Sequence, residues 1–296
     1  MKNTFILGAD IGGSHITTAI IDLKTSVILP GTLFRLPVDS HGTREEVLTV
    51  WYKALRAAVE AYQLTDICIG ISIPGPFDYD NGISLIKDQD KYDALYGHNV
   101  KALLAEKFGM GENNIRLLND AGAFLRGEIF AGAATGFKDV IGVTLGTGLG
   151  TSRCHHGLAE DANLWCSPFL DSIAEDYLST RWFVKRYTEL TGKKIIDVKA
   201  LSKLVGKDRL SLQVFTEFGK NLGLFLAGFV QQEKPEAVIL GGNISKASHL
   251  FLPETEKVLA QHNATVKIKI AKLGESAALM GAASCWHQED PVIIQK

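Results

Sequence analysis

Two glycine-rich turns follow apolar runs of this 296-residue chain, and their residue types suit phosphate binding. The first is Asp10-Ile11-Gly12-Gly13-Ser14-His15, and the second is Thr144-Leu145-Gly146-Thr147-Gly148-Leu149-Gly150. Glycine has no Cβ, so backbone N–H groups at such turns can approach a phosphate closely. Neither turn is a Walker P-loop or a dinucleotide fingerprint, because the Gly-Lys-Ser/Thr run and the glycine spacing of those motifs are missing. Taken alone, each is more typical of an ordinary tight turn.

Two aspartates stand at the ends of apolar runs, where a carboxylate could act on a phosphate or a hydroxyl. Asp10 could hold a magnesium ion, usually through waters. Asp120 follows Asn119 directly after Leu117-Leu118, and a lone aspartate there is most often a helix N-cap. In a cleft that faces a sugar, Asp120 could accept the proton of an attacking hydroxyl, and Asn119 could bind neighbouring hydroxyls.

A third glycine turn, Gly241-Gly242-Asn243, follows the apolar run Val238–Leu240. Backbone at a Gly-Gly pair can lie flat against an adenine or a ribose. By itself the pattern is weak, because many buried strands end in Gly-Gly.

Hydrophobic periodicity and turn residues predict an α/β chain whose strands deliver these turns. Predicted strands cover 5–9, 17–22, 27–36, 67–73, 115–118, 140–145, 237–240 and 266–271, and predicted helices cover 45–62, 99–108, 121–131, 171–190, 215–232 and 276–287. A strand, a glycine turn and a second strand open each half of the chain. This repetition indicates a duplicated α/β unit, two lobes and a cleft between them, with the boundary near residue 119.

The composition excludes several classes of protein. Hydrophobic residues make up 46% of the chain, which excludes a mostly disordered or collagen-like protein. The net charge of -2 gives no electrostatic case for binding nucleic acid or an anionic membrane. The 4 cysteines are scattered, and no apolar run reaches the roughly 20 residues of a membrane span, so we expect a cytoplasmic protein without a disulfide framework.

The order of these motifs resembles that of the ROK family of sugar kinases and repressors, within the actin-like ATPase and hexokinase superfamily. The resemblance covers nearly the whole chain, about Phe5 to Ala283. Six segments resemble, in order, the family's first phosphate motif, its Pro-Gly-Pro turn beside the sugar, its catalytic aspartate segment, its second phosphate motif, its adenosine motif and its closing helix. They are DIGGS at 10–14, IPGPFD at 73–78, LNDAGAFLRGE at 118–128, TLGTGLG at 144–150, ILGGNIS at 239–245 and LGESAALMGAA at 273–283.

The resemblance implies a two-lobed actin-like ATPase (ribonuclease H-like) α/β fold with an inter-lobe cleft. We expect residues 1–118 and a C-terminal helix near 284–296 to form the small lobe, and residues 119–283 to form the large lobe. The resemblance also implies an ATP-dependent kinase that phosphorylates a hexose or an N-acyl hexosamine at the 6-hydroxyl, with Asp120 as the general base. No nucleic-acid or membrane partner is expected, and a homodimer is the assembly common in the family.

The same resemblance implies which residues bind the substrates. The sugar would contact Gly75, Asn119, Asp120, Glu160, Asn163 and Glu175. The nucleotide would contact Asp10, Gly12, Gly13, Ser14, His15, Thr147, Gly148, Gly241, Gly242 and Asn243, with Mg²⁺ held near Asp10 through water.

The chain departs from the family pattern at the zinc cluster. Asn163 stands where the family has a zinc-ligating, sugar-contacting histidine, and Cys166 is the one cysteine where three are expected. Tetrahedral zinc needs four ligands, so we expect no structural zinc here. Trp165, Pro168 and Phe169 are expected to replace it by apolar packing. The loss of the histidine leaves the identity of the sugar open.

Two other classes of protein share this fold. A sugar-responsive repressor of the family carries a DNA-binding module before the first phosphate motif, which begins here at residue 10. A non-catalytic sugar-binding or sugar-sensing protein could have lost its site together with the zinc cluster. Asp10, Asn119, Asp120 and both phosphate-type turns are intact, so an enzyme is the expected class.

Overall fold

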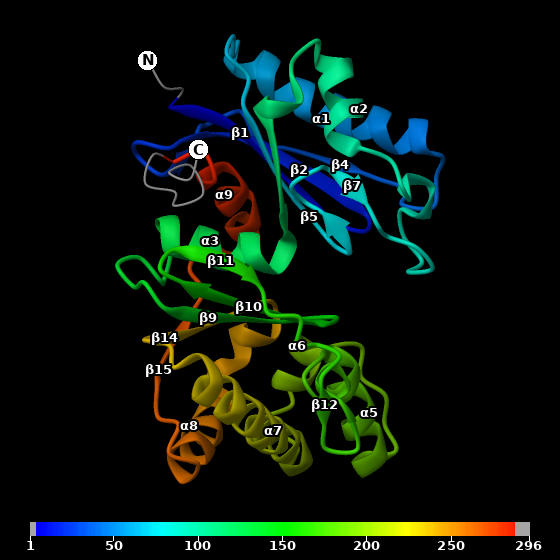
Figure 1. The fold of residues 1–296 in the computed structure, drawn as a ribbon. Coiled ribbons are helices and arrows are strands. Elements are labelled where there is room, and N and C mark those ends of the chain that lie inside the picture. The colour runs from blue at the N-terminus through cyan, green and yellow to red at the C-terminus, as the bar shows by residue number, and fades with distance from the viewer. Residues whose placement is uncertain (1–3, 288–296) are drawn as a thin grey trace. The chain divides into compact units, whose positions relative to one another are not determined.

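The computed structural model describes residues 4–287 of the chain, and these fall into two compact units. Unit 1 contains the described residues up to Thr135, the segment Gly157–Glu160 and the described residues from Glu275 onward. Unit 2 contains Gly136–His156 and Asp161–Gly274. Each unit has its own sheet, its own helices and its own hydrophobic core (Figure 1). The predicted α/β class is therefore confirmed.

The sheet of unit 1 has the strand order β3-β2-β1-β5-β8, and β4 also pairs with β2. The strands are β1 (Phe5–Ile11), β2 (His15–Asp22), β3 (Val27–Ile28), β4 (Phe34–Pro37), β5 (Ile69–Ile73) and β8 (Ile115–Asn119). β1 and β2 form the predicted antiparallel hairpin, whereas β1, β5 and β8 run parallel. The carboxyl ends of these three strands therefore meet at one edge of the sheet, where α/β proteins bind ligands.

One predicted strand of unit 1 is interrupted. The strand expected over 27–36 is present as the two short strands β3 and β4. Pro30-Gly31 separates them, and Gly31 has a φ of 78°, which extended backbone does not adopt. β4 consequently turns back to pair with the first half of β2.

Helices cover both faces of this sheet. They are α1 (Arg44–Tyr62), α2 (Val100–Phe108), α3 (Asp120–Ala131) and α9 (Ala277–Ser284). Successive residues of β1 point to opposite faces: Leu7 and Ala9 join the core with α1 and α2, whereas Gly8 faces α9. Figure 1 shows α1 and α2 on one side of the sheet and α9 on the other. The shorter elements are β6 (Phe77–Asp78), β7 (Ile83–Ser84), η1 (Asp93–Leu95), η2 (Glu112–Asn114) and, leading into α9, η4 (Gly274–Ser276).

The ends of α1 and α2 follow from local sequence signals. The Thr43 side chain caps α1, and Glu46 returns a hydrogen bond to the Thr43 backbone, which completes a capping box. Asn99 caps α2, and Gly109 ends it in the left-handed conformation. Both helices consequently lie close to their predicted bounds.

Helices α3 and α9 pack closely because small residues line their contact. A Cβ on Gly127 of α3 would overlap the carbonyl oxygen of Ala277, and a Cβ on Gly281 of α9 would overlap that of Ala123. Backbone therefore approaches backbone directly, which only glycine allows at these two positions. This contact makes α3 and α9 parts of the same unit.

The expected lobe boundaries, at 118/119 and 283/284, differ from the division between the units. That division falls after Thr135 and before Glu275, because α3 and α9 pack together in unit 1. The helix predicted over 276–287 ends at Ser284. Most of the C-terminal helix expected near 284–296 lies outside the described residues, since the description ends at residue 287.

The sheet of unit 2 has five strands, and the four that lie wholly in this unit have the order β10-β9-β14-β15. These four are β9 (Val140–Leu145), β10 (Leu149–His155), β14 (Ala237–Gly241) and β15 (Lys267–Ile270). The short strands β11 (Leu158–Asp161), β12 (Pro168–Phe169) and β13 (Ser172–Ile173) follow β10 in the chain. β9 and β10 form the second predicted hairpin, and β14 runs parallel to β9.

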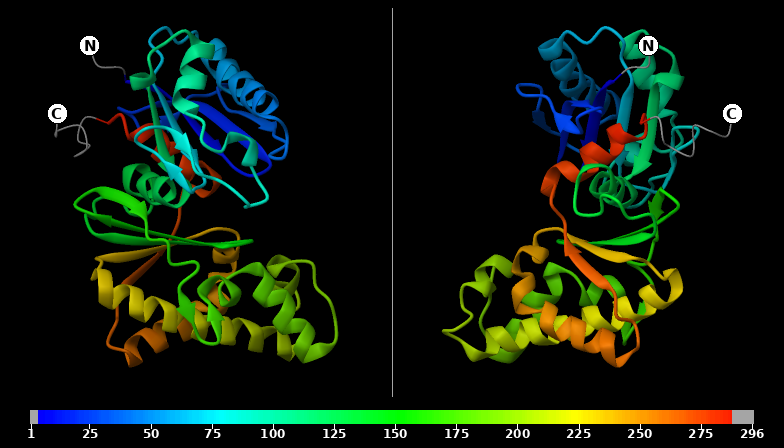
Figure 2. Two further views of the ribbon diagram at one scale, coloured as in Figure 1. Left: turned by 45° about the vertical axis from the view of Figure 1, so that its right-hand side comes forward. Right: turned by 90° about the vertical axis from the view of Figure 1, so that its left-hand side faces the viewer.

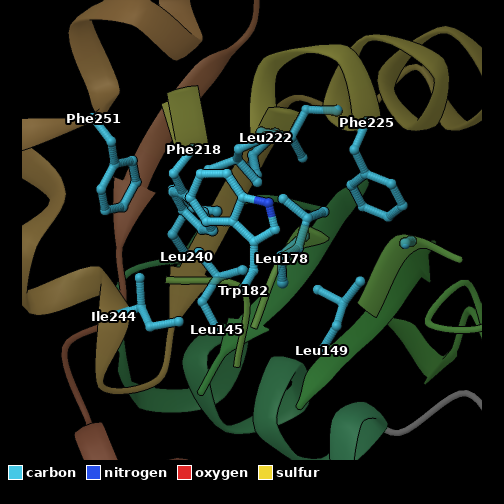
Figure 3. Packing of buried hydrophobic residues seen from close by; sticks show 14 of the residues in the cluster. Leu145, Leu149, Leu178, Trp182, Phe218, Leu222, Phe225, Leu240, Ile244 and Phe251 are labelled. Atoms are coloured by element: carbon cyan, nitrogen blue, oxygen red, sulfur yellow. The ribbon is translucent and has the colours of Figure 1, made fainter. Parts of the chain in front are cut away.

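The helices of unit 2 bury an aromatic core against this sheet. They are α4 (Ala174–Tyr177), α5 (Thr180–Thr191), α6 (Val198–Ser202), α7 (Arg209–Glu233), η3 (Ile244–Leu250) and α8 (Leu252–Gln261). Figure 2 shows α7 and α8, in yellow and orange, side by side. Phe218 of α7 lies at the centre of the core, with its ring centroid 4.5 Å from that of Phe183 and 5.1 Å from that of Phe251. Figure 3 shows Trp182 and Leu145 reaching the same cluster.

The single helix predicted over 171–190 is wrong. Ser172 and Ile173 belong to a two-stranded hairpin with β12, and Leu178–Ser179 separates α4 from α5. Neither α6 nor α8 is among the predicted helices. Within the described part of the chain, no helix has the length and apolar character needed to cross a membrane.

Candidate active site

Asp10 lies near the carboxyl end of β1, beside Ser72 of β5. The Ser72 hydroxyl donates a hydrogen bond of 2.9 Å to the Asp10 carboxylate. The pKa of Asp10 is raised to about 6; burial is the largest cause, and the negative charges of Asp120 and Glu275 act in the same direction. The Ser72 hydrogen bond and the positive charge of Arg35 oppose this shift. The strand registers pair Asp10 with Ser72 and Ser72 with Leu118, so Asp120 lies at the same sheet edge as Asp10.

The first glycine turn is held in shape from both sides. The Gly12 N–H donates to the His15 carbonyl oxygen at 2.9 Å, and the buried Tyr92 hydroxyl donates to the Gly12 carbonyl oxygen at 2.5 Å. A Cβ on Gly12 would touch only the His15 carbonyl oxygen, and a Cβ on Gly13 would meet nothing within 4 Å. The space beside Gly13 is open, and the space beside Gly12 is limited only by the His15 carbonyl oxygen at 3.7 Å, which fits a ligand that approaches the backbone.

Asn119 and Asp120 occupy the junction between β8 and α3. Asn119 is the N-cap, since its side-chain oxygen accepts hydrogen bonds from the N–H groups of Ala121 at 2.8 Å and Gly122 at 3.2 Å. Its amide group donates to the Tyr79 hydroxyl at 3.2 Å. Because Asn119 supplies the cap, the Asp120 carboxylate is not required for it.

The Asp120 residue is exposed, yet the protein around its carboxyl group raises its pKa. Burial is the main cause, while the Ala121 N–H and the positive charge of Lys91 oppose it. The exposure of the residue and the raised pKa are compatible if the carboxyl group has water on one side and dense protein on the other. A carboxylate with a raised pKa is a better proton acceptor than an ordinary surface aspartate.

Gly75 and Glu160 lie beside this junction. A Cβ on Gly75 would lie 3.0 Å from the Tyr79 hydroxyl and 3.8 Å from the Asn119 amide nitrogen. The Glu160 backbone passes α3 so closely that a Cβ on Gly122 would lie 3.4 Å from the Glu160 Cα. Unit 1 therefore brings together the predicted residues of the β1, β5 and β8 ends.

The second glycine turn, in unit 2, is contacted by Glu175. The Leu149 N–H donates to Glu175 Oε2 at 3.0 Å, and a Cβ on Gly148 would lie 2.6 Å from the same oxygen. Arg181 donates to Glu175 Oε1 at 2.5 Å and to the Thr147 carbonyl oxygen at 3.2 Å. Glu175 is expected at the sugar from its sequence position, but in unit 2 its carboxylate binds the turn expected to bind phosphate.

The third glycine turn packs against the second. Gly242 has a φ of 81°, and a Cβ there would overlap the Leu145 carbonyl oxygen. Packing inside unit 2 is thus enough to require this glycine. The Asn243 side chain accepts a hydrogen bond of 2.7 Å from Lys246. Gly241 and Thr144 are partners in the β14–β9 register, which places the two turns at the same edge of the sheet.

Asn163 lies in the left-handed region with a φ of 52°. Its side-chain oxygen accepts a hydrogen bond of 2.9 Å from the Trp165 indole N–H. Phe169 packs on Tyr177 and Phe225, as expected for apolar packing in place of zinc. The expectation is wrong for Trp165, whose 42% exposure shows that it does not enter this packing.

Among residues 4–287, no group of three or more His, Cys, Asp and Glu side chains is arranged to hold a metal ion. A nucleotide-bound Mg²⁺ needs less, because it takes one or two carboxylates together with phosphate oxygens and waters. Asp10 fits that requirement: it is a half-buried carboxylate at the first turn, and a nearby cation would favour its charged form.

Sequence reasoning missed four residues of the candidate site: Arg35, Ser72 and Tyr92 near the first turn or Asp10, and Tyr79 beside Asn119. Ser72 could have been found from the strand alignment, because it stands two residues before the turn residue Pro74, as Asp10 stands two residues before the turn residue Gly12. The other three reach the site from loops or an edge strand, and no local pattern marks them.

The two α/β units, each with a glycine turn at a sheet edge, have the actin-like ATPase fold of the solved structures that resemble this chain. The ROK family matches residues 6–289, and the chain belongs to that family.

Named relatives agree with this placement. The chain is 24% identical to the N-acetylgalactosamine kinase AgaK of Shewanella sp. (strain ANA-3), over 96% of this chain and 97% of the relative. It is 25% identical to the glucokinase of Thermotoga maritima, over 96% of this chain and 98% of the relative. The solved ROK family glucokinase from Streptomyces griseus, in complex with glucose and AMPPNP, shares the fold with a TM-score of 0.73 at 24% identity, covering 95% of this chain and 98% of that one.

Proposed function

We propose that the protein is an ATP-dependent carbohydrate kinase that phosphorylates a hexose or an N-acyl hexosamine at its 6-hydroxyl. The observation that carries this proposal is the pairing in unit 1 of Asp120, a carboxylate with a raised pKa, with the open glycine turn that follows Asp10. The relatives named as sugar kinases support the substrate class.

In the proposed reaction, the sugar hydroxyl oxygen attacks the γ-phosphorus of ATP. The bond from this phosphorus to the β–γ bridging oxygen breaks, ADP leaves, and the hydroxyl proton passes to the Asp120 carboxylate. Asn119 and Gly75 would orient the sugar, and the free backbone N–H groups of the first turn would hold phosphate oxygens. Asp10 would hold Mg²⁺, which when bound neutralises phosphate charge.

The test is a panel of glucose, N-acetylglucosamine, N-acetylgalactosamine and N-acetylmannosamine with Mg·ATP, read by ADP release. Turnover with one of these sugars, and a product phosphorylated at carbon 6 by ³¹P–¹H NMR, is the expected result. A product phosphorylated at another carbon would overturn the 6-hydroxyl assignment alone.

One observation favours a second candidate, a sugar-binding protein without kinase activity. Asn163 and Glu175, two of the residues expected at the sugar, are bound to Trp165 and to the second glycine turn. Sugar binding by calorimetry without ADP release from any member of the panel would establish this candidate and overturn the kinase.

A further inference from the structure

A positively charged side chain, Arg35 of β4, adjoins the first glycine turn of unit 1. The β4–β2 register pairs Arg35 with Thr17, so the Arg35 side chain reaches diagonally to His15 at the start of β2. Its guanidinium donates to His15 Nε2 and to Glu275 Oε2, the latter at 2.8 Å. The Arg35 charge also reaches Asp10, whose pKa it lowers.

The donor and acceptor chemistry of the side chains fixes the direction of the hydrogen bonds that link Arg35, His15 and Ser14. A guanidinium can only donate, so His15 Nε2 is unprotonated and accepts from Arg35. A neutral imidazole carries its proton on the other nitrogen, so His15 Nδ1 donates to Ser14 Oγ, 2.7 Å away. Burial and the Arg35 charge lower the pKa of His15, in agreement with the neutral ring. The Ser14 hydroxyl therefore keeps its own proton for another acceptor.

The same turn offers further donors. Within the described residues, the N–H groups of Gly13 and Ser14 have no hydrogen-bond acceptor. No protein atom stands within 4 Å of the position of a Cβ on Gly13. Backbone N–H groups, the Ser14 O–H and the Arg35 guanidinium are all donors, and together they suit an anion with several oxygens.

The ion pair between Arg35 and Glu275 is weak. The side chains of Arg35 and Glu275 are 50% and 82% exposed, and ion pairs at such exposure contribute little free energy. A phosphate can therefore displace Glu275 from Arg35 at small cost. Guanidinium also matches phosphate in its planar pair of donors.

We propose that Arg35 and the Ser14 hydroxyl bind an outer phosphate of ATP, that His15 sets the Ser14 hydroxyl as a donor, and that Glu275 competes with the phosphate for Arg35. This inference rests on the proposed function, because it places the nucleotide at the first turn. It adds a binding residue, Arg35, that no motif of the sequence contains.

The experiment measures binding of ATP, AMP and inorganic phosphate by calorimetry without sugar, for the wild type, Arg35→Gln, Arg35→Lys, Glu275→Gln and Arg56→Gln. Arg56 is the matched control, since it forms a similarly exposed pair with Glu60 on α1. We expect Arg35→Gln to weaken ATP about 10- to 100-fold and AMP less than about threefold, with partial recovery in Arg35→Lys. Glu275→Gln should leave ATP affinity unchanged or raise it, and Arg56→Gln should leave it unchanged.

The outcomes separate the two claims. A wild type that binds ATP, together with an Arg35→Gln variant that binds it equally well, overturns this inference and leaves the kinase proposal standing. Equal loss of ATP affinity in Arg35→Gln and Glu275→Gln also overturns it, because the pair would then be structural. A wild type that binds inorganic phosphate as tightly as ATP assigns the site to free phosphate and overturns the nucleotide assignment. A wild type that binds no nucleotide overturns both claims.

Discussion

Ser72 and Asp10 stand side by side on two parallel strands, and the serine hydroxyl donates to the aspartate carboxylate at 2.9 Å. This hydrogen bond stabilises the charged carboxylate, but burial outweighs it and leaves the pKa of Asp10 at about 6. The protein thus keeps at its first turn a carboxylate whose charge lowers the stability of the free fold. A bound cation would remove that penalty.

Replacement of Asp10 should stabilise the free protein near neutral pH. The folded-state pKa of about 6 exceeds the ordinary 3.8, so the contribution of Asp10 to stability is full below pH 4 and is lost as pH rises through about 6. Asp10→Asn should raise the free energy of unfolding at pH 7.5 by roughly 1–3 kcal/mol and change it little at pH 4. Urea unfolding at the two pH values measures this.

Asp22 on the same hairpin is the control for Asp10. Hydrogen bonds from Thr25 hold the pKa of Asp22 below its usual value, so its contribution to stability is present near neutral pH and is lost on acidification. Asp22→Asn should therefore destabilise the protein at pH 7.5. Equal effects of Asp10→Asn at pH 4 and pH 7.5 would contradict the assignment of a raised pKa to Asp10.

Asp120→Asn should lower turnover by roughly 10²–10⁴-fold, because the amide cannot accept the hydroxyl proton. ATP affinity should stay near that of the wild type, and the variant should be at least as stable, because Asn119 supplies the helix cap and the change removes a carboxylate whose charged form burial disfavours. Steady-state kinetics on the best sugar, with ATP titration by calorimetry, measure both. Asp197→Asn, a change at the exposed N-cap of α6, controls for loss of a helix-terminal carboxylate. Near-normal turnover in Asp120→Asn would exclude Asp120 as the base.

Gly127→Ala should destabilise unit 1. The new Cβ would overlap the Ala277 carbonyl oxygen, so α3 and α9 would have to move apart, at roughly 1–3 kcal/mol or more. Gly228→Ala on α7 is the control, because a Cβ there meets nothing within 4 Å. Alanine should stabilise that exposed helix position by about 0.5–1 kcal/mol. Changes of the same sign in the two variants would show that close contact is not the cause.

Glu175→Ala should destabilise unit 2, since the Leu149 N–H and Arg181 both lose their acceptor. The loss of hydrogen bonds to a charged group predicts about 1–3 kcal/mol by thermal or urea unfolding. Arg181→Ala should cost less, because Glu175 would keep its bond from Leu149. If Glu175→Ala instead left stability unchanged and raised only the KM for the sugar, Glu175 would be a sugar contact and not a support of the second turn.

Local patterns predicted much of the fold. The hairpin at 5–22 follows from two β-rich runs around Gly12-Gly13, and α1 follows from its apolar spacing. The helix predicted over 171–190 failed because Leu170, with a φ of 51°, and the β12–β13 hairpin reverse the chain just before α4. Periodicity does not report such a reversal.

The candidate site was predicted where its residues lie in contiguous motifs. Asp10, Asn119 and Asp120 follow directly after the predicted strands 5–9 and 115–118, so parallel pairing brings them to one edge. Arg35 and Tyr92 could not be predicted, because they reach the first turn from segments far along the chain. The position of Glu175 on the second turn depends on the chain reversal at Leu170, and the helix predicted over 171–190 does not include such a reversal.

The contact of α3 with α9 has a consequence for synthesis on the ribosome. Unit 2 is encoded almost without interruption, whereas unit 1 takes α9 from a segment that follows all of unit 2. A nascent chain can therefore complete unit 2 first, and α3, which begins at Asp120, lacks its neighbour α9 until residues 277–284 have been made. A truncated product that stops before residue 277 would contain all three glycine turns, but it would expose the face of the unit 1 sheet that α9 normally covers.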